Sequence, residues 1–421
     1  MKEKAADIAI VGAGAAGLMT AVWAGRTAQT KRKALRILLF DTRRKVGAKI
    51  LMSGGTRCNV TNRGVKPSDF QGGARHFIKH ILEAFTPQET LRFFKEIGVE
   101  LVSEPTGKYF PSTHSAQTVL DALLKEVKRL GIILVTGIRI TKIEKAGEFF
   151  HLTGDGGPGT GGQSHTTGLW SQWIARKVIL TTGGRSYPTT GSDGTGYEIA
   201  KSLGHTLIPT FPALTPLLTK DNDWKELSGV SLEVEISFFK YAKKQWECLD
   251  SFLFTHFGFS GPAALDISRH FAAAKTEEEP EIFAGFLPGE NESSLKAKLA
   301  AVQKKNPKKQ MQNLLAEEFS LPGRFVETLL KKKGGRGLVP ALLNCPLKIT
   351  GVFGYKKAEV TAGGVDLGEV NVSTMESKLV EGLYFAGEIL DADGRIGGFN
   401  FQWAWSTGTL AGRSAARGLL P

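Results

Sequence analysis

The feature that most restricts the fold is a glycine-rich turn directly after the first apolar run. Residues 7–12, DIAIVG, have the composition of a buried strand, and GAGAAG at 12–17 leads into apolar residues at helical spacing. In a GxGxxG turn the glycines allow a tight bend, close approach of a pyrophosphate to the backbone, and close helix packing. The following helix adds amide donors at its N-terminus. The predicted pyrophosphate-binding positions are Gly12, Gly14, Ala15, Ala16 and Gly17.

A second apolar run, residues 36–41, ends in Asp41, 24 positions after Gly17. Strand, helix and second strand make a βαβ unit, which is the context that a GxGxxG motif needs. An acid at the carboxyl end of the second strand accepts hydrogen bonds from ribose hydroxyls and disfavours a 2′-phosphate. Asp41 therefore favours FAD or NAD over NADP.

The C-terminal part of the chain favours FAD over NAD. Residues 381–388, EGLYFAGE, have the pattern of a buried strand that ends at Gly387, and we expect a helix after Gly398. Asp393 is expected at the ribityl-pyrophosphate region of FAD, and the helix is expected to direct amides at the flavin pyrimidine edge. The alternative for Asp393 is an acid in a surface turn.

The chain is expected to divide one nucleotide-binding sheet between its two ends. A buried-strand pattern at 177–182 ends in Gly183 and Gly184, and the composition changes after about residue 204. We predict an α/β protein with an FAD-binding Rossmann-like domain formed by residues 1–204 and 356–421. An inserted substrate domain, residues 205–355, is expected to combine a β-barrel-like part with a lysine-rich helical subdomain at about 293–333.

Composition narrows the class of protein. The three cysteines are scattered and make neither a disulfide framework nor a metal-ligand pair, so we expect no metal and a reducing cytoplasm. No apolar run reaches 18 residues, so no membrane association is predicted. The formal charge of +13 gives a positive average potential that attracts polyanions. The lysine clusters at 304–309 and 331–336 are interpreted either as solvated helix faces or as contacts to RNA phosphates.

Several stretches together resemble the HI0933-like (BaiN-like) family of bacterial FAD-dependent oxidoreductases, which have the two-dinucleotide-binding-domain flavoprotein fold. The resemblance covers nearly the whole chain and lies in GAGAAGLMTA, SGGTRCNVTN at 53–62, GKYFPST at 107–113, FTHFGFSGPAALDIS at 254–268, and the run from 374 to 412. The chain departs from the family pattern at Thr56, where glycine is usual, and in TGSDGTG at 190–196.

The resemblance implies that a polar segment beside the ribose acid passes next to the flavin. Its expected cofactor contacts are Lys49, Arg57, Cys58 and Asn59. Cys58 has two readings: a thiol that donates a proton during catalysis, or a structural thiol buried near the cofactor. Further along the chain, the expected cofactor contacts are Gly183, Gly184, Gly387, Asp393, Gly398, Phe399 and Asn400.

His256, in the sequence THFGFSGP, belongs to a motif of the inserted domain that the resemblance places on the substrate side of the flavin. A catalytic role is one reading; a structural or merely exposed histidine is the other.

The resemblance implies reduction of an activated C=C bond, with NAD(P)H as electron donor. Two substrates are implied: uridine in 23S ribosomal RNA, reduced to dihydrouridine, and small enones such as bile-acid steroids. The basic charge favours ribosomal RNA as the partner. A third reading is a ribosome-assembly factor that binds RNA and holds FAD for structure alone.

Overall fold

The computed structural model describes residues 5–156, 171–332 and 337–420. The chain forms two compact units, Met1–Thr210 with Val360–Pro421, and Phe211–Glu359. The sequence-based boundaries, after 204 and before 356, lie a few residues from these.

Unit 1 is built on a nine-stranded sheet whose main path runs β20-β21-β22-β10-β1-β2-β7. Neighbouring strands from β22 to β7 are parallel, and β9 pairs antiparallel with β10 and β8. The strands of this sheet are β1 (Ala5–Val11), β2 (Ile37–Asp41), β7 (Ile133–Thr136), β8 (Ile138–Ala146), β9 (Phe149–Gly156), β10 (Ser171–Leu180), β20 (Val370–Asn371), β21 (Glu376–Ser377) and β22 (Leu383–Phe385). The split Rossmann-like sheet therefore takes strands from both ends of the chain.

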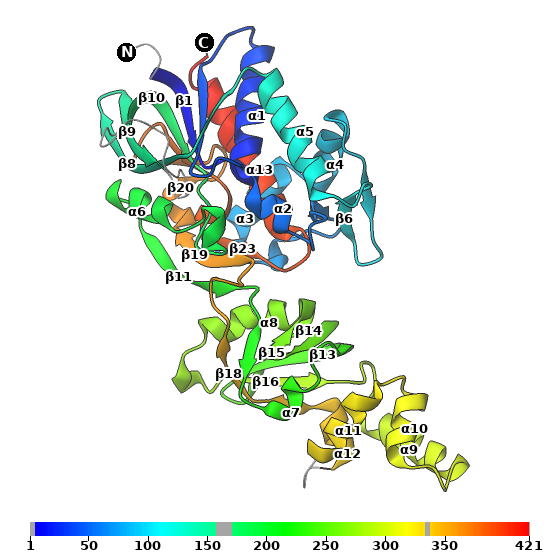
Figure 1. Cartoon of the computed structure of the whole chain (residues 1–421). Helices are drawn as coiled ribbons and strands as arrows, with labels where there is room; N and C mark the ends of the chain where they lie inside the picture. The colour runs from blue at the N-terminus through cyan, green and yellow to red at the C-terminus, as the bar shows by residue number, and fades with distance from the viewer. Residues whose placement is uncertain (1–4, 157–170, 333–336, 421) are drawn as a thin grey trace. The chain divides into compact units, whose positions relative to one another are not determined.

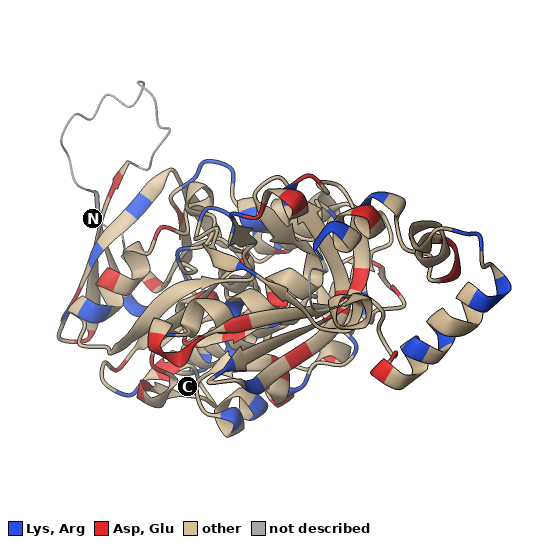
Figure 2. Ribbon diagram, turned by 90° about the horizontal axis from the view of Figure 1, so that it is seen from below, with Lys and Arg blue, Asp and Glu red and all other residues tan. Residues whose placement is uncertain are grey.

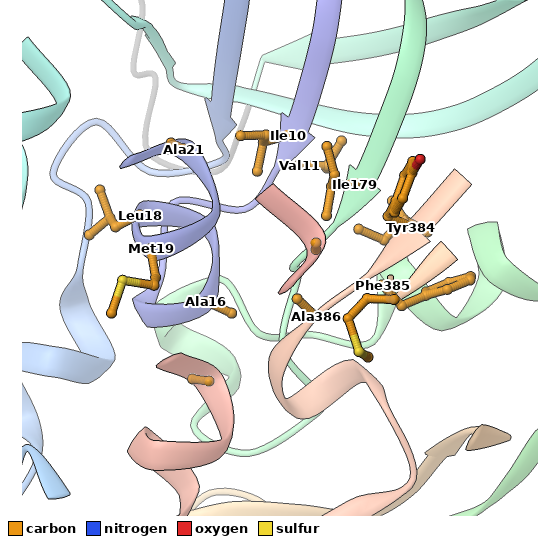
Figure 3. Packing of buried hydrophobic residues seen from close by; sticks show 14 of the residues in the cluster. Ile10, Val11, Ala16, Leu18, Met19, Ala21, Ile179, Tyr384, Phe385 and Ala386 are labelled. Atoms are coloured by element: carbon orange, nitrogen blue, oxygen red, sulfur yellow. The ribbon is translucent and has the colours of Figure 1, made fainter. Parts of the chain in front are cut away.

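Continuous apolar runs form the central strands because both faces of a parallel sheet are covered. Ile10 of β1 lies opposite Ile179 of β10, and Leu180 lies opposite Phe385 of β22. Figure 3 shows Ile10, Ile179 and Phe385 in one cluster with Ala16. These three side chains and Leu180 are fully buried. Because these strands are buried on both faces, their carboxyl ends hold fixed positions, and the candidate site described below lies at those ends.

Two long helices, α1 (Ala15–Thr30) and α13 (Phe399–Arg417), pack side by side on this sheet (Figure 1). Glycines set their close approach: a Cβ at Gly408 would lie 2.7 Å from the carbonyl oxygen of Ala16, and one at Gly412 would overlap that of Thr20. Larger side chains would separate the helices.

The other elements of unit 1 support this core. The helices are α2 (Ala48–Met52), α3 (Arg75–Ala84), α4 (Pro87–Glu96), α5 (Ala116–Arg129) and α6 (Thr195–Ser202). Two small sheets consist of β3 (Thr61–Asn62), β5 (Leu101–Ser103) and β6 (Lys108–Pro111), and of β4 (Phe70–Gly72) with β23 (Ala392–Gly394). The remaining pair is β11 (Leu207–Ala213) with β19 (Val360–Val365).

Unit 2 contains one antiparallel sheet in the order β17-β16-β13-β14-β15-β12-β18. Its end strands β17 and β18 are not paired with each other among the described residues, so the sheet is open where the sequence predicts a barrel-like form. The strands are β12 (Leu217–Thr219), β13 (Ser231–Lys240), β14 (Lys243–Thr255), β15 (Gly258–Ser260), β16 (Glu281–Gly285), β17 (Cys345–Leu347) and β18 (Ile349–Val352).

Helix α8 (Gly261–Ala273) packs against β13 and β14, and four helices follow β16. They are α9 (Glu292–Lys305), α10 (Met311–Glu318), α11 (Gly323–Lys332) and α12 (Leu338–Leu343); the short α7 (Asn222–Lys225) precedes β13. Buried aromatic rings join the helices to the sheet: Trp224 stacks on Phe325 at 6.3 Å, and Phe286 lies 4.7 Å from the same ring.

Candidate active site

The glycine turn connects β1 to α1 at the carboxyl edge of the sheet. Gly12 has φ +108°, and a Cβ there would lie 2.5 Å from the carbonyl oxygen of Thr181. A Cβ at Gly17 would overlap the carbonyl oxygen of Gly12. At Gly14, by contrast, a Cβ would meet no atom within 4 Å. Gly12 and Gly17 are thus needed by the fold, whereas Gly14 leaves open space beside the N-terminus of α1.

Asp41 lies directly beside this turn. Its Oδ2 accepts a hydrogen bond from the Ala13 N–H at 2.9 Å, and its Oδ1 accepts one from the Arg43 N–H at 2.8 Å. Burial raises the pKa of Asp41, and the two backbone donors oppose that rise. The carboxylate therefore fixes the turn, and its remaining lone pairs are available to ribose hydroxyls.

A charged cluster lies where β10 and β22 end. Lys49 donates to Glu388 at 2.6 Å and to Ser186 at 2.7 Å, and Ser186 donates to the other oxygen of Glu388 at 2.5 Å. The Thr361 N–H also donates to Glu388. A Cβ at Gly184 would overlap Thr361 and lie 2.9 Å from Glu388. The predicted Lys49 and Gly184 thus meet at Glu388, which sequence reasoning did not select.

Two further predicted glycines close the same edge. Gly387 has φ +81°, and a Cβ there would lie 2.6 Å from that of Ala16. Its carbonyl oxygen accepts a hydrogen bond from the Trp403 indole at 3.2 Å. Gly183 has φ +71° and lies against Ser192. The glycine turns after β1, β10 and β22 therefore come together.

The segment after α2 is strongly bent. Positive φ angles occur at Gly54, Gly55, Thr56 and Cys58, with +69° at Thr56. This angle explains why glycine suits position 56, because a β-branched residue is strained there. The Arg57 side chain is occupied: it donates to Glu104 at 2.7 Å and lies over the Phe110 ring at 4.1 Å.

Cys58 is 0% exposed, and burial raises the pKa of its thiol to about 12. A substrate cannot contact this thiol without rearrangement of the segment. These two observations favour the structural reading of Cys58 over the proton-donor reading.

The N-terminus of α13 lies beside Asn59. The side-chain oxygen of Asn59 is buried and has no hydrogen-bond partner, and a Cβ at Gly398 would lie 2.8 Å from it. Asn59 as a whole is 8% exposed. A buried polar atom without a partner lowers stability, so we expect a bound ligand to donate a hydrogen bond to the Asn59 oxygen.

Other predicted contacts at this end have structural partners. The Asn400 side chain accepts from the Gly394 N–H and donates to the Gly394 carbonyl, at 2.8 and 2.9 Å. The Phe399 ring packs edge-on against Phe70 at 6.3 Å. The side chains of Asn400 and Phe399 therefore support β23, the strand before α13. The backbone amides of these two residues are the groups left to bind a cofactor. Asp393 is 2% exposed, so it is a buried strand residue and not the surface acid of the alternative reading.

His256 lies in unit 2, at the turn between β14 and β15, and is exposed. Its imidazole is 4.9 Å from the Phe257 ring. Gly258, with φ +147°, fixes this turn because a Cβ would overlap the carbonyl oxygen of Leu217. The turn therefore presents His256 rather than burying it.

Within residues 5–156, 171–332 and 337–420, no helix combines the length and the apolar character that a membrane span needs. In the same residues, no three His, Cys, Asp or Glu side chains are grouped to hold a metal ion.

A parallel sheet with this turn, its acid and an open N-terminal helix defines a Rossmann-type dinucleotide-binding protein. Residues 6–414 match the family described as HI0933-like protein Rossmann domain. The chain is 32% identical to a 3-dehydro-bile acid delta(4,6)-reductase of Clostridium scindens, over 97% of this chain and 98% of that protein. It is also 32% identical to the ribosomal RNA dihydrouridine synthase of Haemophilus influenzae, again over 97% and 98%.

The fold is also found among solved structures. A 3-ketosteroid delta1-dehydrogenase from Sterolibacterium denitrificans matches with TM-score 0.52 and 11% identity, over 99% of this chain and 100% of that one. An open flavocytochrome c3 fumarate reductase matches with TM-score 0.50 and 16% identity, over 99% and 79%. The chain belongs to the HI0933-like family and is an FAD-dependent oxidoreductase.

Proposed function

We propose that the protein reduces uridine to dihydrouridine in 23S ribosomal RNA, in the cytoplasm, with NAD(P)H as electron donor. The observation that carries the RNA substrate is the charge of α9 and the turn after it, shown in blue in Figure 2. Lys304, Lys305 and Lys308 make no ion pair with any described residue, whereas Lys298 pairs with Glu290 and Lys309 with Glu317. In the second cluster, Lys331 and Lys332 are both paired with acids. Lys333 and Arg336 of the second cluster lie outside the described residues. Unpaired lysines on an exposed helix suit RNA phosphates.

The site residues fit FAD. The open space at Gly14 and the amides of α1 suit the pyrophosphate, and Asp41 suits the adenosine ribose. The unpartnered Asn59 oxygen beside the α13 N-terminus suits the N–H of a flavin pyrimidine ring. We propose that Lys49 and Glu388 bind the middle of the cofactor, between these two regions.

Bound FAD supplies a hydride donor. Reduction of uridine adds a hydride at C6 and a proton at C5, so the protein must hold an acid near C5. A thiol with a pKa of about 12 stays protonated at neutral pH but is a weak acid, and Cys58 is buried. Of the two predicted catalytic residues, His256 is the exposed one, and we propose it as the acid to test first.

Reduction of a small enone is the second candidate, and it is favoured by the bile-acid reductase relative at equal identity. A steroid needs an apolar pocket but not the unpaired lysines of α9. The third reading, an assembly factor without turnover, predicts RNA binding without modified uridine.

The test is to quantify dihydrouridine by mass spectrometry in 23S ribosomal RNA from cells with and without the gene, and with the gene restored. We expect loss and rescue. Unchanged dihydrouridine would refute the RNA reaction. Restoration with a Lys304→Ala/Lys305→Ala/Lys308→Ala variant should recover less dihydrouridine, whereas the matched variant Lys298→Ala should recover it fully.

A further inference from the structure

A row of three aromatic rings lies on the surface of unit 2. The His256 ring is 4.9 Å from Phe257, and Phe257 is 5.2 Å from Phe353 at an interplanar angle of 72°. Phe353 is 36% exposed, and His256 is exposed as well. We call these three residues the aromatic row. Phe257 is half-buried and contacts both of them, so the row presents one apolar ring and one imidazole to solvent.

The backbone holds the aromatic row in place. Phe257 and Phe353 come from β-strand ends that flank β12 on its two sides. The Phe353 N–H donates to the Pro216 carbonyl at 2.9 Å, and the Thr219 N–H donates to the Phe257 carbonyl at 3.3 Å. The backbone that carries both rings is therefore held by the sheet before any ligand arrives, which lowers the entropy cost of binding.

Four exposed lysines lie on the chain segments that adjoin the aromatic row. Lys357 places its ammonium 5.7 Å from the centre of the Phe353 ring, and Lys356 precedes it. Lys220 follows the β12 residue that is bonded to Phe257, and Lys348 offers its carbonyl to that same β12 residue at 2.7 Å. None of the four makes an ion pair with another residue that the structure describes. The nearby Asp221 is bound by Lys332 at 2.6 Å.

We propose that the aromatic row stacks an unpaired nucleobase of the RNA substrate, while these lysines contact the flanking phosphates. Bases have flat faces that stack on aromatic rings without regard to sequence, and the strand carries a charge at each nucleotide. Rings bordered by unpaired cations match that alternation, whereas a steroid presents at most one anionic group. The proposal rests on the RNA substrate proposed above and adds where that RNA is held.

The test uses the FAD-loaded protein without an electron donor and a short single-stranded RNA that carries 2-aminopurine. We expect Phe353→Ala to weaken binding about 5- to 150-fold, the range for loss of one stacked base. The quenching of 2-aminopurine fluorescence should fall with it. Phe353→Trp should keep both affinity and quenching, because it keeps an aromatic face. Lys356→Ala/Lys357→Ala should weaken binding and flatten its salt dependence.

Tyr241→Ala is the matched control, since Tyr241 is 60% exposed at the opposite end of β14 and its neighbours Lys240 and Lys244 are paired with acids. It should leave RNA binding unchanged. The proposal is overturned if Phe353→Ala binds as the parent does, or if Phe353→Trp loses as much as Phe353→Ala. It is also overturned if Phe353→Ala impairs only binding of a steroid enone.

Dihydrouridine is measured separately, so the two proposals fail in different ways. If Phe353→Ala weakens RNA binding but no dihydrouridine is found in the cell, the role of the aromatic row is supported and the proposed reaction is refuted. If dihydrouridine is formed but Phe353→Ala binds RNA as the parent does, the proposed reaction is supported and the role of the aromatic row is refuted.

Discussion

Gly14→Ala separates cofactor binding from folding at the glycine turn. Gly14 has φ −80° and ψ −164°, which alanine adopts without strain, and the added Cβ meets no protein atom within 4 Å. Alanine restricts the unfolded chain, which stabilises by about 0.4–1 kcal/mol. It is also a poorer N-cap than glycine, which costs about 0.5–1 kcal/mol. The free energy of unfolding of the FAD-free protein should therefore change by less than about 1 kcal/mol.

The same methyl group occupies the space that we assign to the pyrophosphate. Loss of one charge-assisted hydrogen bond costs about 1.5–3 kcal/mol, which raises the Kd for FAD roughly 10- to 150-fold. The assay is a titration of FAD into FAD-free protein, followed by flavin fluorescence, beside urea unfolding of the same sample. Gly323→Ala is the matched control, since its Cβ also meets nothing at the start of a helix, α11. An unchanged Kd in a stably folded Gly14→Ala protein would refute the placement of the pyrophosphate.

Four other substitutions test the rest of the site and its support. Cys58→Ala should cost about 1 kcal/mol of stability but keep turnover within about twofold, because the thiol is fully buried; a tenfold loss would restore its catalytic role. Thr56→Gly should relieve a left-handed backbone worth about 1–2 kcal/mol, less about 0.5–1 kcal/mol for glycine entropy, and raise Tm by about 1–2 °C. Glu388→Gln should lower the stability of the protein by about 1.5–3 kcal/mol, because Lys49 loses its charged partner. The variant should also release FAD during gel filtration; normal retention of FAD would contradict this. Arg129 and Arg26 hold the pKa of Glu126 at about 2, below its usual range, so its stabilisation of about 1–2 kcal/mol should be complete above pH 4.5 and be lost as pH falls toward 2; Glu126→Gln should flatten that acid limb in urea midpoints.

Local spacing predicted the Rossmann-like part because its signals are short in sequence. The glycine turn and Asp41 belong to one βαβ unit, and the structure joins them by the Ala13–Asp41 hydrogen bond. Helix α3 gave no such signal, since Ala74 precedes it and offers no side-chain cap. Amphipathic spacing alone did not mark its start.

Long-range pairs explain what sequence reasoning missed in the site. Glu388 binds Lys49 across 339 positions, and no local pattern links the two. The same holds for the unpartnered oxygen of Asn59 beside Gly398. Cys58 was selected for its chemistry, but burial, which depends on packing from distant segments, decides what its thiol can do.

The packing of α13 on α1 also sets an order in time. Synthesis adds about 5–20 residues per second, so α13 leaves the ribosome about 20–80 s after α1 does. During that interval β10 lacks its partner β22, and the small residues of α1 that receive Gly408 and Gly412 stay uncovered. Unit 2 is complete before that point, because its last residue, Glu359, precedes β22. FAD bound by contacts from both ends of the chain, as proposed above, can make all of them only after α13 has been synthesised, and until then the exposed edge of β10 is open to pairing with other chains.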